Sequence, residues 1–145
     1  MPIKIKTGDR EMTISVFRLY LLRAGYLLIA LAMGGLTWPQ ILDPAANWSF
    51  NQGVVRCMLG ALTLLCLLGV RYPLQMLPLL MFELTWKMIW LARVALPAWM
   101  SGHIDDGMAE NIFAVGIGAI YWFIIPWRYV VDRYVTQSGD RWAWR

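Results

Sequence analysis

Four long apolar runs alternate with short polar connections along the chain. The runs cover approximately residues 16–38, 52–70, 74–99 and 109–127. About 20 apolar residues in a helix cross the hydrocarbon core of a bilayer, and a spanning segment must satisfy its backbone hydrogen bonds internally. The pattern therefore predicts an all-α fold, in which residues 1–145 form one integral membrane domain built as a four-helix transmembrane bundle.

The positions of the basic residues give this bundle an orientation. Lysine and arginine gather at the start of the first run, between the second and third runs, and after the fourth: Lys4, Lys6, Arg10, Arg18, Arg23, Arg71, Arg128, Arg133, Arg141 and Arg145. The connections at residues 39–51 and 100–111 contain neither residue type. Because basic residues are retained on the cytoplasmic side, we expect a multi-pass protein of a bacterial cytoplasmic (inner) membrane. Both termini lie in the cytoplasm in this topology, and residues 128–145 form an interfacial tail.

Composition agrees with a membrane location and limits the chemistry. The chain has 145 residues, is 59% hydrophobic and carries a net charge of +4, whereas a soluble domain is about 45–50% apolar. The basic residues form no single patch, so we expect no nucleic-acid partner. Cys57 and Cys66 lie nine positions apart on one run, too far along a helix to form a disulfide. With His103 as the one histidine, we expect neither a metal nor a cofactor.

Glu83 and Lys87 are the main candidate binding residues. They lie near the middle of the third run, where a single charged side chain costs at least about 2.5–3.5 kcal/mol. Their i,i+4 spacing places both on one helix face, where they can form an ion pair, and Trp86 and Trp90 flank that face. Two interpretations stay open: the pair locks the helix register, or it lines a cavity that binds a proton, an ion or a polar headgroup.

A second charged cluster is predicted near the outer ends of the runs. Arg56 lies close to the start of the second run, Arg93 near the end of the third, and Glu110 at the start of the fourth. These side chains either extend to the interface and form salt bridges there, or together hold an anion or a phospholipid headgroup, since arginine binds phosphate in a bidentate manner.

Small residues occur at the spacing that lets two helices approach closely. Ala30 and Gly34 form such a pair in the first run, and Ala114 and Gly118 form another in the fourth. The pattern favours packing between the helices of one chain over a homodimer interface.

Two stretches, FELTWKMIWLARVALP (residues 82–97) and PWRYVVDRYVTQSGDRW (residues 126–142), resemble a family of short, uncharacterised bacterial four-span integral membrane proteins. The resemblance implies a topology and brings no activity with it.

The sequence therefore predicts a small polytopic membrane protein and favours a non-enzymatic role over a membrane-embedded enzyme. We expect this protein to bind a polar ligand, a lipid headgroup or a protein partner around Glu83 and Lys87. The alternative is a small proton- or ion-coupled transporter or channel subunit. The expected partners are membrane lipids, together with a second copy of the chain or another membrane protein.

Overall fold

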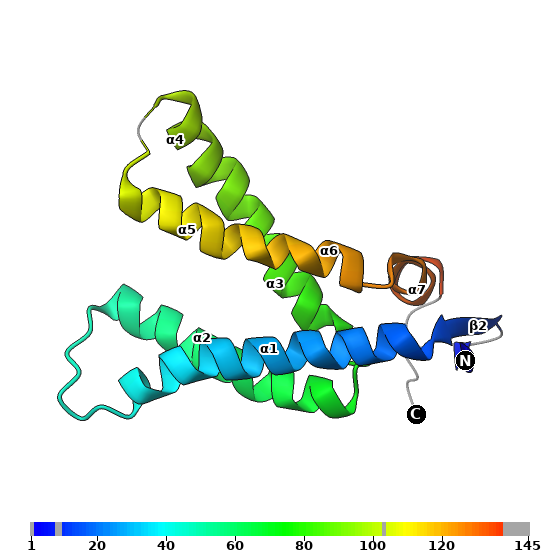
Figure 1. Ribbon diagram of the computed structural model, residues 1–145. Coiled ribbons are helices and arrows are strands. Elements are labelled where there is room, and N and C mark those ends of the chain that lie inside the picture. The colour runs from blue at the N-terminus through cyan, green and yellow to red at the C-terminus, as the bar shows by residue number, and fades with distance from the viewer. Residues whose placement is uncertain (1, 8–9, 103, 138–145) are drawn as a thin grey trace, which may run out of the picture.

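Helices dominate the computed structural model, which describes residues 2–7, 10–102 and 104–137 (Figure 1). In chain order the helical elements, which include the π-helical segments η1 and η3 and the 3₁₀ segment η2, are α1 (Val16–Ile41), α2 (Phe50–Arg71), α3 (Leu77–Trp90), η1 (Leu91–Ala95), α4 (Leu96–Met100), α5 (Asp106–Ile117), η2 (Gly118–Ile120), α6 (Tyr121–Ile124), α7 (Trp127–Val131) and η3 (Asp132–Thr136). Ahead of α1, β1 (Pro2–Thr7) pairs antiparallel with β2 (Arg10–Ser15). The all-helical prediction did not include this β-hairpin.

Three helices are long and apolar enough to cross a membrane: Val16–Ile41, Phe50–Arg71 and Asp106–Ile124. They correspond to the first, second and fourth predicted runs. The third run is also helical, from Leu77 to Met100. It stands apart from the other three because it contains Glu83, Lys87 and Arg93, and because η1 interrupts its regular α-helical geometry.

The surface of the helices is largely apolar. Large side chains such as Leu31, Phe113 and Phe123 are 65%, 73% and 77% exposed. A soluble monomer rarely exposes apolar surface on this scale, whereas lipid is a suitable neighbour for it. The exposed faces of α1, α2 and α5 therefore agree with a membrane protein.

α1 and α2 form the first helical hairpin, and close packing holds it together. The Tyr26 side chain is fully buried against Gly69, where a side chain would collide with the tyrosine ring, and its hydroxyl donates a hydrogen bond to the carbonyl of Pro73 (3.0 Å). Nearer the other end, the Trp38 indole donates to Thr63 Oγ1 (2.9 Å). Gly34, from the predicted small-residue pair of the first run, packs on Thr63, so this pattern serves intramolecular contact.

The elements α3 to α6 form the second helical hairpin, which has irregular turns in both arms. Pro97 has no N–H to give the carbonyl of Arg93, and its ring would collide with that carbonyl in a regular helix. The wider π turn of η1 (Leu91–Ala95) lies at this position. In the other arm, the tighter 3₁₀ turn η2 (Gly118–Ile120) lies where this arm contacts α3.

The two hairpins meet near one end and diverge toward the other (Figure 1). At the meeting point, Tyr121 on α6 donates a hydrogen bond to the carbonyl of Gly25 on α1 (3.2 Å). Arg18 on α1 donates to the carbonyl of Phe123 (3.4 Å). The connections α1–α2 and α4–α5 lie far apart at the diverging end, so the arrangement is more open than the predicted bundle.

The fourth helical segment ends earlier than predicted and does not continue into the tail. α6 stops at Ile124, because Ile125 precedes Pro126 and adopts an extended backbone. A new helix, α7, begins at Trp127 and runs across the direction of α6 (Figure 1). The predicted tail at 128–145 is described only to residue 137, and within that range it is α7 and η3.

Candidate functional site

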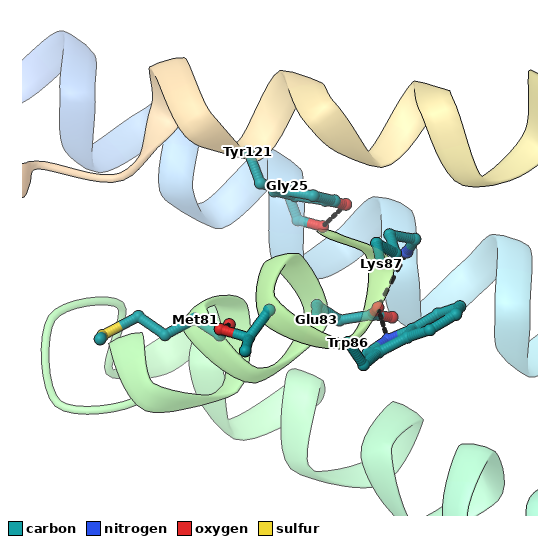
Figure 2. A network of polar contacts seen from close by, with 7 residues as sticks. Gly25, Met81, Glu83, Trp86, Lys87 and Tyr121 are labelled. Carbon is teal, nitrogen blue, oxygen red and sulfur yellow. Dashed lines mark hydrogen bonds and ion pairs between the residues drawn. The ribbon is translucent and has the colours of Figure 1, made fainter. Parts of the chain in front are cut away.

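Glu83 is the most deeply buried charged group in the described part of the chain. Its side chain is 0% exposed, and it sits on α3 close to the buried apolar residues Leu80 and Leu84. Lys87, one turn later, places its ammonium Nζ 2.8 Å from Glu83 Oε2. The Trp86 indole Nε1 donates a second hydrogen bond to the same oxygen. The predicted i,i+4 pair therefore exists as an ion pair reinforced by a tryptophan (Figure 2).

The other carboxylate oxygen, Glu83 Oε1, is buried and has no hydrogen-bond partner in the part of the chain that the structure describes. The great majority of buried polar atoms in proteins have a hydrogen-bond partner, and leaving one without a partner costs about 1–3 kcal/mol of stability. Both available donors, Trp86 and Lys87, are directed to Oε2. The carboxylate is therefore half satisfied by the protein itself.

The surroundings of the ion pair come from both hairpins. Lys87 packs directly on Gly118 of η2, where any side chain would overlap with the lysine stem. The Tyr121 ring lies next to this contact and reaches across to Gly25 on α1 (Figure 2). Tyr121 and the buried Cys66 of α2 both lie close enough to Glu83 to interact with it electrostatically. Glu83 thus sits where α1, α2, α3 and α6 come together.

Lys87 and the two tryptophans are partly exposed neighbours of Glu83 on α3. The Lys87 side chain is 12% exposed, while Trp86 and Trp90 are half-buried. The lysine ammonium lies 4.9 Å from the centre of the Trp86 ring, which is a cation–π distance. Figure 2 shows the Trp86 indole nitrogen and the Lys87 ammonium both directed at the Glu83 carboxylate.

The predicted outer cluster is not brought together by ion pairs. Arg56 on α2 is half-buried and lies over the ring of Trp48, with 5.1 Å between the guanidinium carbon and the ring centre. Arg93 on η1 and Glu110 on α5 are exposed members of the second hairpin. Among the described residues, no salt bridge joins any two of these three. The divergence of the hairpins, which separates α2 from η1 and α5, accounts for the separation of Arg56.

Several residues of the site were not singled out as binding residues from the sequence. Gly118 was noted only as a helix-packing residue, and Gly25, Cys66 and Tyr121 were not predicted to be near Glu83. The proximity of Gly118 and Tyr121 depends on how the two arms of the second hairpin pack, and that of Gly25 and Cys66 depends on how the two hairpins cross. No local pattern encodes either arrangement. The one available signal was Gly118 itself, since a small residue on a spanning helix marks a place of close approach.

The described residues contain no group of three or more histidine, cysteine, aspartate or glutamate side chains that could hold a metal. His103, the histidine of the α4–α5 connection, lies outside the described residues. Cys57 is exposed, Cys66 is buried, and both are free thiols.

Comparison with known proteins gives no match: no family model, no curated protein and no solved structure is significantly similar to this chain.

Proposed function

We propose that this chain is a non-enzymatic, four-span membrane protein that binds a polar ligand at Glu83 and Lys87. The observation that carries the proposal is the fully buried carboxylate with one unpartnered oxygen, Glu83 Oε1. A pair with a purely structural role gains stability by satisfying all of its polar atoms. Ionisable residues inside a membrane protein are functional candidates, and this one lies at the junction of two hairpins rather than within a closed core.

The proposed topology has four spans in a bacterial cytoplasmic membrane, with both termini in the cytoplasm. β2, the α2–α3 connection and α7 lie at one end of the helices, and the α1–α2 and α4–α5 connections lie at the other (Figure 1). The first end carries Arg18, Arg71 and Arg128, and the connections at the second end contain no lysine or arginine. This distribution supports α3 to α4 as a fourth span, because the segment begins at the end that carries the arginines and finishes at the end that lacks them.

Cysteine labelling tests this topology. In a background with Cys57→Ala and Cys66→Ala, we expect an impermeant maleimide added to cells with a permeabilised outer membrane to modify Ala45→Cys and Ser101→Cys. It should modify Tyr72→Cys only after the inner membrane is also broken. The three positions are exposed in the α1–α2, α4–α5 and α2–α3 connections. Labelling of Tyr72→Cys and Ser101→Cys from the same side would show that the segment from α3 to α4 does not span.

Ligand retention tests the binding function. We expect native mass spectrometry of protein extracted with its lipids to show a bound molecule that is about tenfold less retained by Glu83→Gln. The expected factor corresponds to the loss of one hydrogen bond to a charged group, about 1.5–3 kcal/mol. Thr85→Val is the matched control, because Thr85 is an exposed neighbour on α3 whose hydroxyl donates to the Met81 carbonyl (2.7 Å) and makes no hydrogen bond with Glu83 among the described residues. Equal retention by wild type and Glu83→Gln would contradict the proposal.

A small proton- or ion-coupled transporter is the second candidate. It is favoured by the position of Glu83 where the two hairpins meet, since transporters place ion sites at such junctions near the middle of the membrane. In the same set of variants, a transporter predicts ion flux into proteoliposomes that is present for wild type and Thr85→Val and absent for Glu83→Gln. Ligand retention without flux assigns the site to binding.

A further inference from the structure

The chemistry around Glu83 restricts which ligand this site accepts, provided that it is the binding site proposed above. Glu83 Oε1 is a carboxylate oxygen, buried and without a donor among the described residues. A carboxylate accepts hydrogen bonds and offers none. The first requirement is therefore a ligand group that donates a hydrogen bond to this oxygen.

The charge of the site argues against an ionic ligand. Glu83 and Lys87 together are neutral, with Nζ 2.8 Å from Oε2. A cation at Oε1 would come close to the lysine ammonium, in a low-dielectric environment where like charges repel strongly. An anion would lie against the negatively charged carboxylate, which repels it in the same environment. A neutral donor avoids both repulsions.

Lys87 adds a second requirement. Its ammonium has three N–H donors, and within the described residues it makes one hydrogen bond, to Glu83 Oε2. It therefore keeps donor capacity next to the unpartnered carboxylate oxygen. A hydroxyl group both donates and accepts, so that one hydroxyl can donate to Oε1 and accept from Lys87.

The depth of the site indicates the source of that hydroxyl. Lys87 lies ten residues beyond the start of α3 at Leu77, which is about 15 Å along the helix and half the thickness of the hydrocarbon core. Trp86 and Trp90, its neighbours on the helix, are half-buried, and the neighbouring Ile89 is 59% exposed. A molecule that reaches this depth past apolar and aromatic side chains is itself largely apolar. Phospholipids, whose charged headgroups stay at the interface, do not match.

We propose that the Glu83–Lys87 pair is a binding site for the free hydroxyl of an uncharged lipid, of the diacylglycerol type. Gly118 is part of this site, because the absence of a side chain there leaves room for the Lys87 stem. The carboxylate holds the hydroxyl proton, the ammonium holds its oxygen, and the tryptophans contact the acyl chains.

The test is a binding titration followed by native mass spectrometry, with 1,2-dioctanoylglycerol as the probe. Wild type and Gly116→Ala should bind it with equal affinity, since nothing lies within 4 Å of a Cβ at Gly116. Gly118→Ala, which displaces Lys87, and Lys87→Met, which removes its donors, should each weaken binding about tenfold or more. The analogue with its hydroxyl acetylated should bind as weakly to wild type as the probe binds to Lys87→Met.

Three results would overturn this inference. Equal binding of the acetylated analogue would show that the acyl chains alone are recognised. Equal binding of free glycerol at the same concentration would show that the hydroxyl does not need a lipid. The third result is that neither 1,2-dioctanoylglycerol nor glycerol binds, while Glu83→Gln still loses the co-purifying molecule. The binding function then stands, and the ligand does not bind through a neutral hydroxyl.

Discussion

Replacing Lys87 with methionine should be the most destabilising single change at the ion pair, lowering the free energy of unfolding by about 3–5 kcal/mol. Methionine keeps the length and the apolar stem of lysine but removes the ammonium. Glu83, which is 0% exposed, then remains buried with the Trp86 indole as its only donor among the described residues. Unfolding by denaturant titration in bicelles measures the change.

Glu83→Gln should cost much less than Lys87→Met. Glutamine has nearly the same shape, keeps an oxygen that accepts from Trp86, and no longer carries the desolvation penalty of a buried carboxylate. The Lys87 side chain is 12% exposed, and the long apolar stem of a lysine lets its ammonium reach a more polar environment. The double variant should recover most of the loss caused by Lys87→Met, because no unpaired charge is left.

The relative size of these two effects separates a structural pair from a binding site. A carboxylate retained for ligand binding is held at some expense of stability, and its neutral replacement is tolerated or stabilising. If Glu83→Gln destabilises the protein as strongly as Lys87→Met, the pair serves to fix the helix register. That result would argue against both the proposed function and the lipid hydroxyl site.

The helices could be predicted from the sequence because lipid imposes a simple pattern on them. The predicted runs 16–38 and 52–70 correspond closely to α1 and α2. At the start of α2 a capping box is visible in the sequence, since Ser49 and Gln52 satisfy each other's backbone N–H groups. The β-hairpin was missed, although isoleucine and lysine alternate over residues 3–6, a period-two pattern typical of a strand.

The candidate site could be predicted only as far as one helix reaches. The i,i+4 rule joins Glu83 to Lys87 from spacing alone, and the structure contains that contact. The contact of Lys87 with Gly118 requires the packing of the two arms of the second hairpin. The contact between Tyr121 and Gly25 requires the relative position of the two hairpins, which a short connection joins. The outer cluster failed to form ion pairs for the same reason, because membrane depth alone says nothing about lateral distance. Arg56 instead contacts Trp48, a neighbour within its own hairpin.

The second large effect is expected at Gly69, where α2 contacts α1. A Cβ at this position would lie within 2.6 Å of three atoms of the Tyr26 ring, closer than real side chains approach each other. The ring has little freedom to move, because it is fully buried and its hydroxyl is bound to the Pro73 carbonyl. Gly69→Ala should therefore separate the two helices and cost about 1–3 kcal/mol, the usual range for overpacking.

Gly35→Ala on α1 provides the matched control, because nothing lies within 4 Å of a Cβ at that position. The same added methyl group should there be neutral or slightly stabilising, since alanine is the better helix former. A smaller partner, Tyr26→Leu, should restore part of the stability of Gly69→Ala when the two changes are combined, as expected for residues in direct contact. Equal unfolding free energies for Gly69→Ala and Gly35→Ala would mean that α1 and α2 are not packed through Tyr26. The junction that buries Glu83, to which Cys66 contributes from the same face of α2, would then need a different arrangement.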